Sequence, residues 1–242
     1  MTKAESQHEG RFARRSVRLG DAMPELLEAV PAEDRPLAER VLVAEQLEAT
    51  NDDFAEALET VAPQAFDFLV VGGLVLKETT LEARSALELL TRGDVLAPPL
   101  TRMRQVESRA VSRYVAHGKA SVAVLDGRFR QAARRWPELS DVLHDQLGRQ
   151  THRASMHMAM LHLPRVDERI VALFTDLSER CGYVTADGIV VDVPLTHDVI
   201  GRLVGSRRPT VSLALHALQQ SDVLSRAEDG AWRLRVPAAY AP

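Results

Sequence analysis

The chain has 242 residues, of which 45% are hydrophobic and 26% charged, and its net charge is −4. This length suits one large domain or two small ones, and the composition is that of a globular protein. The overall negative charge does not attract nucleic acid, so any contact with nucleic acid needs a local basic patch. The single cysteine, Cys181, excludes an internal disulfide framework and an all-cysteine iron–sulfur site within one chain.

The first segment, residues 1–18, is polar and has no hydrophobic periodicity. It lacks the apolar core of a signal peptide, and we expect a mobile tail there. The most apolar run of the chain, residues 66–76, is too short to span a bilayer. The sequence therefore predicts a cytoplasmic protein without a membrane partner.

Residues 19–136 carry the pattern of a β-roll with flanking helices. Apolar residues between Pro24 and Leu58, interrupted by prolines, indicate short helices. Residues 66–78 then predict two strands that turn at Gly72-Gly73. Further short strands are expected at residues 86–90, 95–96, 110–114 and 120–125. Strands at this spacing with glycine turns favour a barrel or roll.

Two helices follow the roll, a short one over residues 126–136 and a longer one over residues 137–163. The longer helix carries an apolar stripe at spacings of three and four residues. The members of this stripe are Leu143, Leu147, Thr151, Ala154, Met158 and Leu161. His152, His157 and His162 also lie on this helix, but steps of five residues turn by about 140°, so they do not share a face and no metal or haem site is expected.

Residues 164–242 begin with a hinge at Leu163-Pro164-Arg165 and a helix over residues 167–180 that ends at Gly182. A small hairpin over residues 183–193, turned at Asp187-Gly188, is expected next.

Residues 193–218 then predict two short helices joined by a glycine turn. Thr196 is a candidate N-cap, Gly205 ends the first helix, Ser206 is a candidate cap of the second, and Pro209 lies in its first turn. Arg207, Arg208, Ser212 and His216 are expected to face solvent. A helix-turn-helix with a basic outer face is typical of DNA-binding proteins.

A second hairpin follows this motif. Residues 223–226 and 232–235 are short strand candidates, and Glu228-Asp229-Gly230 supplies the turn between them. This hairpin is the wing of a winged helix. No acidic residue occurs between Arg202 and Ser221, which favours DNA binding over a purely structural role for the helices.

The motif from Thr196 to Gly205, followed by Arg208-x-Thr210-Val211, resembles the DNA-binding domain of the Crp/Fnr family of bacterial transcription regulators. The resemblance is specific over about residues 167–232 and weaker before them, where Leu90-x-x-Gly93-Asp94-Val95-Leu96 is similar to a turn of the cyclic-nucleotide-binding roll. It implies an α+β chain with a mobile tail (1–18), a cyclic-nucleotide-binding-like β-roll (19–136), a dimerisation helix (137–163) and a winged helix-turn-helix (164–242).

The resemblance also implies roles for single residues. The second helix of the motif would enter the major groove, where Arg208 matches the base-reading arginine of the family. Residues that match backbone-contacting positions are Thr196, His197, Arg207 and Thr210, and Ser212 and His216 complete the candidate DNA-binding face. Pro209 replaces the acidic base reader and Leu213 a basic one, which predicts a different half-site and, for Leu213, contact with a thymine methyl group.

The stripe on the long helix is, by this resemblance, the surface that pairs with its twin in a homodimer. The alternative is that the helix packs only against its own β-roll.

Nucleotide-binding relatives hold their ligand through Gly-Glu and a nearby arginine. Here the matching stretch is Ala97-Pro98-Pro99-Leu100, and Arg109 is the candidate arginine. Two prolines remove backbone donors and no carboxylate replaces the glutamate, so cyclic AMP is not expected to bind. The dimer then either rests in a DNA-competent form or answers to another small-molecule effector.

The sequence therefore predicts a homodimeric transcription regulator that binds a palindromic operator in double-stranded DNA, with RNA polymerase as a further candidate partner. The alternative is a winged-helix scaffold for protein interactions without sequence-specific DNA binding. No nucleophile elbow, phosphate loop or paired metal-ligand motif is present, so neither an enzyme nor a cofactor is expected.

Overall fold

The computed structural model describes residues 13–51, 53–82, 84–98, 110–227 and 230–235. The chain divides into two compact units, and the division falls between Thr151 and His152, inside the longest helix. We call them the N-terminal unit and the C-terminal unit and describe each by itself.

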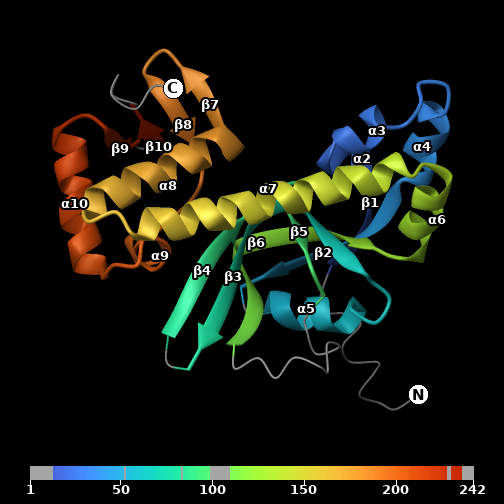
Figure 1. Cartoon of the computed structure of the whole chain (residues 1–242), viewed down its shortest axis with the longest axis horizontal. Helices are drawn as coiled ribbons and strands as arrows, with labels where there is room; N and C mark the ends of the chain where they lie inside the picture. The colour runs from blue at the N-terminus through green and yellow to red at the C-terminus, as the bar shows by residue number, and fades with distance from the viewer. Residues whose placement is uncertain (1–12, 52, 83, 99–109, 228–229, 236–242) are drawn as a thin grey trace. The chain divides into compact units, whose positions relative to one another are not determined.

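The N-terminal unit contains an antiparallel sheet of six strands in the order β1-β2-β6-β3-β4, with β5 paired to β3 (Figure 1). The strands are β1 (Ala13–Arg18), β2 (Val43–Thr50), β3 (Asp67–Leu81), β4 (Arg84–Leu90), β5 (Val95–Leu96) and β6 (Ala110–Leu125).

Strand β1 corrects the expectation of a mobile tail up to Arg18. It pairs with β2 along its whole length, from Ala13 opposite Glu48 to Arg18 opposite Val43. Arg14 on β1 and Glu45 on β2 form a diagonal ion pair at 3.3 Å. The prediction is therefore wrong for residues 13–18, and residues 1–12 lie outside the described residues. The helices expected between Pro24 and Leu58 are present, but β2 interrupts them.

The glycine pair Gly72-Gly73 lies within one long strand and not in a hairpin turn, so the prediction of two strands there is wrong. The register of β3 against β6 shifts on both sides of Gly72, which marks a β-bulge. Gly73 has a φ of 73°, and a Cβ atom there would collide with the carbonyl oxygen of Lys119. The two strands expected within residues 110–125 are likewise one continuous strand, β6.

Alternating side chains of the sheet contribute to two cores. Phe68 and Val122 belong to the core that includes α5 (Asp53–Val61), whereas Leu69 and Ala123 belong to the core on the other face. That second core includes helices α2 (Leu19–Ala22), α3 (Glu25–Glu28), α4 (Arg35–Val41), α6 (Gly127–Arg135) and the first turns of α7 (Glu138–Leu161). Figure 1 shows α5 and the first half of α7 on opposite faces of the sheet.

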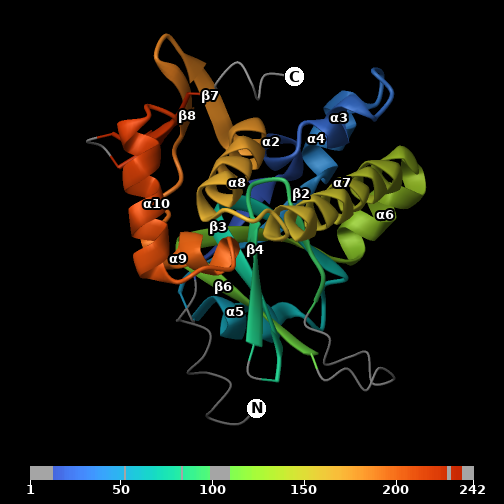
Figure 2. The same ribbon diagram turned by 60° about the vertical axis from the view of Figure 1, so that its left-hand side comes forward.

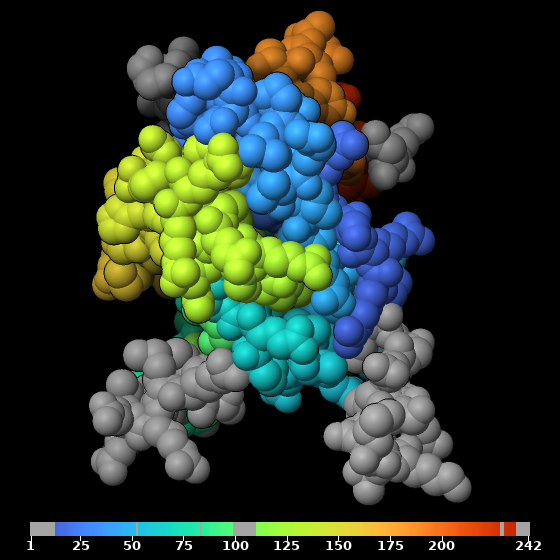
Figure 3. All heavy atoms as spheres, turned by 90° about the vertical axis from the view of Figure 1, so that its right-hand side faces the viewer, coloured from blue at the N-terminus to red at the C-terminus, as the bar shows by residue number. Residues whose placement is uncertain are grey.

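Helix α6 begins as predicted at Asp126, whose carboxylate accepts a hydrogen bond of 2.8 Å from the backbone N–H of Arg128. After its last turn, the Trp136 indole N–H donates to Asp34 at 2.8 Å, which joins α6 to the segment before α4. In the space-filling view of Figure 3, the α3–α4 segment (blue) and α6 (yellow-green) cover adjoining parts of one face.

Helix α7 is hydrogen-bonded to the turn between β4 and β5. The buried Gln146 donates its amide N–H to Asp94 at 3.0 Å, and Asp94 also accepts the backbone N–H of Thr91 at 2.8 Å. One turn further along, the Gln150 amide accepts from the N–H of Val95 at 2.9 Å and donates to its carbonyl at 3.0 Å. These contacts fix the position of α7 along the sheet.

The C-terminal unit combines three helices with a small sheet in the order β7-β8-β10-β9. Its elements are α8 (Val166–Cys181), β7 (Gly182–Thr185), β8 (Gly188–Val191), α9 (His197–Leu203), α10 (Arg208–Gln220), β9 (Leu224–Arg226) and β10 (Trp232–Leu234). Phe174 and Trp232 pack in its core with ring centroids 5.0 Å apart. Both predicted hairpins are present, although Glu228 and Asp229 lie outside the described residues.

Candidate nucleic-acid interface

The first helix of the candidate motif is α9, and it begins at the predicted cap. The hydroxyl of Thr196 accepts a hydrogen bond of 3.3 Å from the backbone N–H of Val199. Val199, Ile200 and Leu203 are buried, so α9 packs its apolar side into the unit. The exposed positions of α9 are at its start, at Thr196 and Asp198, and at Arg202 in its last turn.

A tight turn joins α9 to α10 (Figure 2). Gly205 has a φ of 63°, the left-handed conformation that favours glycine after a helix. Ser206 does not cap α10: the N-cap is Arg207, whose side chain makes no capping bond, and the backbone N–H of Ser206 donates to the carbonyl of Gly201 at 2.8 Å. The predicted serine cap is wrong because this close approach of the turn to α9 uses the Ser206 backbone.

Helix α10 buries one side and exposes the other. Val211, Leu215 and Leu218 are buried, as the spacing predicted. The exposed side carries most of the candidate DNA-contacting side chains, namely Arg207, Arg208, Thr210, Leu213 and His216, with Ser212 half-buried. Leu213 is 74% exposed, which is unusual for a leucine in the middle of a packed helix.

His197 and Ser212 connect the two helices. The Nδ1 atom of His197 lies 2.9 Å from the Ser212 hydroxyl, and that hydroxyl donates to the carbonyl of Arg208 at 3.0 Å. Two of the candidate DNA-contacting residues are thus in direct contact with each other.

Sequence reasoning missed Arg169, which lies on α8 below the turn. Its guanidinium donates to the carbonyl of Leu163 at 2.7 Å and to the carbonyl of Val204 at 3.2 Å. It therefore ties the segment before α8 to the end of α9. An arginine in an otherwise apolar helix stripe is the only signal that the sequence offers for this role.

The six residues of the predicted dimer stripe differ in exposure. Leu143 is only 8% exposed and lies in the core of the N-terminal unit. Leu147 is 44% exposed and Met158 60% exposed, while Thr151 is exposed and Ala154 and Leu161 are half-buried. The exposed part of the stripe therefore begins at Leu147.

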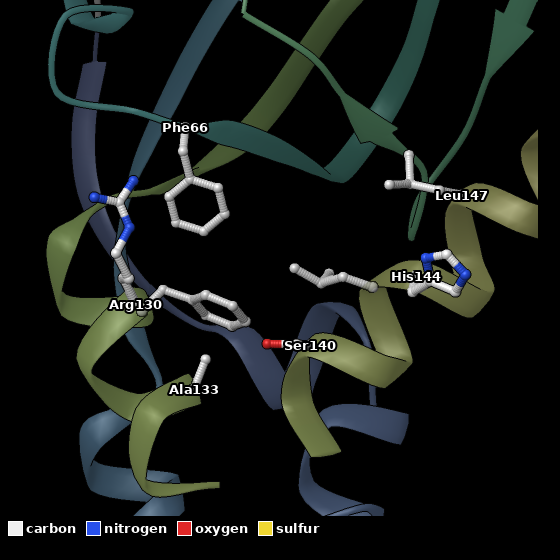
Figure 4. Close-up of a pocket in the computed structure, with 8 residues that line it drawn as sticks. Phe66, Arg130, Ala133, Ser140, His144 and Leu147 are labelled. Carbon is white, nitrogen blue, oxygen red and sulfur yellow. The ribbon is translucent and has the colours of Figure 1, made fainter. Parts of the chain in front are cut away.

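A pocket of about 320 Å³ opens beside the start of α7, between Phe66, α6 and the side chains of Leu143 and Leu147 (Figure 4). Arg130 stacks over the Phe66 ring at 5.2 Å from its centroid. Leu143 and Leu147 therefore line a pocket of the N-terminal unit as well as belonging to the stripe.

The segment expected at the nucleotide site is described only in part. Ala97 and Pro98 follow β5, whereas Pro99, Leu100 and Arg109 lie outside the described residues. The backbone N–H of Ala97 donates to the hydroxyl of Tyr114, and burial, with the charge of Glu88 second, raises the pKa of Tyr114 to about 12. The donor on Ala97 is thus already satisfied within the protein.

Neither a metal-binding group nor a membrane span was found in the part of the chain that the structure describes. No three His, Cys, Asp or Glu side chains there are grouped to hold a metal ion. No helix there is both long and apolar enough to cross a bilayer.

Comparison with known proteins identifies the motif. Residues 168–239 match the family model of the Crp-like helix-turn-helix domain. The global nitrogen regulator of Nostoc sp. is 30% identical over 98 residues, which are 40% of this chain and 44% of that protein. The global nitrogen regulator of Synechococcus elongatus is 29% identical over 89 residues, or 37% and 40% of the two chains. The matches thus span less than half the length of these relatives.

Solved structures share the fold over most of the chain. A CooA mutant from Carboxydothermus hydrogenoformans aligns with a TM-score of 0.58 and 17% identity, covering 79% of this chain and 83% of that one. FixK2 from Bradyrhizobium japonicum aligns with a TM-score of 0.58 and 20% identity, covering 81% of this chain and 94% of that one. A cyclic nucleotide-binding domain containing protein from Listeria monocytogenes aligns with a TM-score of 0.61 and 15% identity, covering 88% of this chain and 97% of that one. The predicted fold is confirmed: a cyclic-nucleotide-binding-like sheet, a long helix and a C-terminal winged helix-turn-helix.

Proposed function

Because the chain belongs to the Crp/Fnr family of transcription regulators, we propose that it acts as a homodimer on a palindromic operator in double-stranded DNA. The observation that carries the proposal is the exposed side of α10, where Arg207 and Arg208 begin a helix that contains no acidic residue. Cationic side chains at such a surface neutralise phosphates and donate to guanine.

In this proposal α10 lies in the major groove. Arg208 donates to the O6 and N7 acceptors of a guanine, and Arg207 contacts a phosphate. Thr196 and His197 at the start of α9, and Thr210 on α10, contact the DNA backbone. Their hydroxyl and imidazole groups are of the kinds that hydrogen-bond phosphate oxygens, and they lie at or beside the exposed ends of the two helices.

The proposed dimer forms through the exposed part of the stripe on α7. Leu147 and Met158 are eleven residues apart, which is about three helical turns, so they share one face of the helix. Thr151, Ala154 and Leu161 lie on the same face, while Leu143 supports it from within its own unit. Pairing of two such faces would double the number of DNA-contacting helices, as a palindrome requires.

Control by cyclic AMP is not part of this proposal. Ala97 uses its backbone N–H on Tyr114, and Pro98 has none to give, so two positions of a phosphate-binding turn are without a free donor. The dimer either rests in a DNA-competent form or responds to another small molecule. RNA polymerase is the expected protein partner of the DNA-bound form.

A second candidate function is supported by one observation. Tyr183 and Val184 are exposed on β7, an edge strand of the small sheet in the C-terminal unit. Exposed apolar side chains on an edge strand suit a protein partner, so the winged helix could instead serve only as a protein-docking module.

Binding to DNA fragments at a series of salt concentrations separates the two functions. A DNA-binding regulator should lose affinity steeply as salt rises, since each phosphate contact releases a counterion, and should retain selected sequences from a random pool. Repeating the measurement with cyclic AMP and cyclic GMP should leave the affinity unchanged. Absence of salt-dependent binding to any DNA would overturn the regulator and favour the docking module.

A further inference from the structure

The exposed side of α10 carries two parallel ridges, each formed by residues four apart. Residues at this spacing lie one above the other on a helix, about 6 Å apart along its axis. All of these side chains are exposed except Ser212, which is half-buried. The polar ridge consists of Arg208, Ser212 and His216, and the apolar ridge of Pro209, Leu213 and Ala217.

The apolar ridge does not contribute to the packing of its own unit. Helix α10 already buries Val211, Leu215 and Leu218 on its inner side. Leu213 remains 74% exposed, with Pro209 one turn before it and Ala217 one turn after it. Removing apolar surface from water is favourable, and these three side chains gain that free energy only when a partner molecule covers them.

We infer that the apolar ridge contacts thymine methyl groups, so that each operator half-site carries a T·A pair within about two base pairs of a guanine bound by Arg208. This inference rests on the proposed function and specifies the DNA sequence class that the surface fits. The thymine C5-methyl is the one apolar group that a base edge presents in the major groove.

The spacing of the ridges sets the distance between the two bases. Arg208 and Pro209 are neighbours at the start of α10, and Leu213 lies about 6 Å further along the axis. Base pairs are about 3.4 Å apart, so this separation covers about two steps of the duplex. Guanine and thymine contacts from one helix are therefore compatible when the bases are adjacent or two pairs apart.

The ridge also disfavours the other bases. Its side chains offer neither a donor nor an acceptor, and Pro209 lacks even a backbone N–H. A cytosine amino group or an adenine N6 and N7 edge placed against the ridge would lose its hydrogen bonds to water without replacement. Discrimination thus comes both from methyl burial and from unsatisfied polar groups.

Charge favours DNA over an apolar protein partner for this ridge. Arg207 and Arg208 are exposed directly before Pro209, and no aspartate or glutamate occurs between residues 202 and 221. A polyanion is the complementary partner for such a surface.

Replacing thymine by uracil tests the inference, because uracil lacks only the C5-methyl. Operators are first selected from a random pool with the full-length protein, and each thymine near the selected guanine is then changed to uracil in one half-site. At one position the wild-type protein should lose about fourfold in affinity, the value expected for one buried methyl group.

Three variants show whether Leu213 causes the effect. With Leu213→Ala, thymine and uracil operators should bind equally, while Leu213→Met should retain most of the preference. Val184→Ala removes a comparably exposed apolar side chain, 83% exposed on β7, and should leave the thymine preference at its wild-type size.

The outcomes separate the inference from the proposed function. Two results would overturn the inference and leave the proposed regulator function intact. One is sequence-specific binding whose affinity does not change with uracil at any position. The other is a set of selected half-sites without thymine near the guanine. If the pool yields no sequence at all, both the regulator and the inference fail.

Discussion

The imidazole Nδ1 of His197 lies 2.9 Å from the hydroxyl of Ser212, and this contact joins the start of α9 to the second turn of α10. The Ser212 hydroxyl has one proton, which it donates to the carbonyl of Arg208 at 3.0 Å. It must therefore accept from His197, which fixes the Nδ1–H form of the imidazole. In the neutral ring Nε2 of His197 is then a hydrogen-bond acceptor, and it can donate to a phosphate oxygen only when the ring is protonated.

A double-mutant cycle on His197 and Ser212 should reveal this contact. Each alanine variant should lower the free energy of unfolding, and the coupling energy should be about 0.5–1.5 kcal/mol. Nitrogen NMR of the imidazole should show the proton on Nδ1 in the wild type, and a mixture of the two forms in Ser212→Ala. A coupling energy near zero would mean that the two side chains do not interact in solution.

Gly201 and Gly148 should respond in opposite directions to the same substitution. A Cβ atom at Gly201 would lie 2.7 Å from the carbonyl oxygen of Ser206, so Gly201→Ala must push the turn away from α9 and should cost about 1–3 kcal/mol. Gly148, exposed within α7, has nothing within 4 Å of its Cβ position, and Gly148→Ala should stabilise by about 0.5–1 kcal/mol. Urea unfolding of both variants measures the difference. Equal effects would show that the turn can move without cost.

The C-terminal unit could be predicted well from sequence because its signals are local. Thr196 as a cap, Gly205 after a helix and the two short hairpins each act within a few residues. The serine cap failed because the backbone of Ser206 is held by Gly201, a contact between two elements that no local rule reports.

The N-terminal unit was harder because its sheet depends on distant partners. Strand β1 has the sequence ARRSVR, which shows no hydrophobic alternation, and it is a strand only because β2 pairs with it. Gly72-Gly73 has the composition of a turn, but the proximity of Lys119 on β6 makes it a bulge. No local pattern predicts the contacts of Gln146 and Gln150, because Asp94 and Val95 are distant in sequence and the fold brings them beside α7.

Arg208 and Arg207 should affect DNA binding differently. Arg208→Ala should weaken binding to the selected operator by about 1–3 kcal/mol and relax the preference at one base pair of each half-site. Arg207→Ala should weaken binding to all sequences alike and reduce the slope of affinity against salt by about one. Titrations with operator and random DNA measure both. Equal losses on the two DNAs for both variants would mean that Arg208 does not contact a base.

The exposed part of the α7 stripe should determine the oligomeric state. Leu147→Glu would bury a charge in the proposed dimer interface and should raise the dissociation constant of the dimer by at least about tenfold. Met156, 57% exposed, lies nine residues further along, on the opposite face of the helix, so Met156→Glu is the matched control and should not change it. Sedimentation equilibrium compares the two variants. A Leu147→Glu protein that remains as dimeric as the control would remove α7 from the interface.

Asp67 should make the stability of the protein depend on pH. It is half-buried at the start of β3, and burial raises the pKa of its carboxyl from 3.8 to about 6. Between these two values the folded protein holds a proton that the unfolded chain has released. The free energy of unfolding therefore falls as pH rises from about 4 to about 6, and the destabilisation persists at neutral pH.

Asp67→Asn removes this ionisation while keeping the size of the side chain. Relative to wild type, the variant should gain stability as pH rises from 4.5 to 7.5. The gain should be about 1 kcal/mol, less than the full value for a two-unit shift, because solvent screens a half-exposed carboxyl. Urea unfolding across this pH range measures the difference between the two proteins. Parallel pH profiles would show that the Asp67 carboxyl titrates alike in the folded and unfolded states, so that its burial at the start of β3 carries no electrostatic cost.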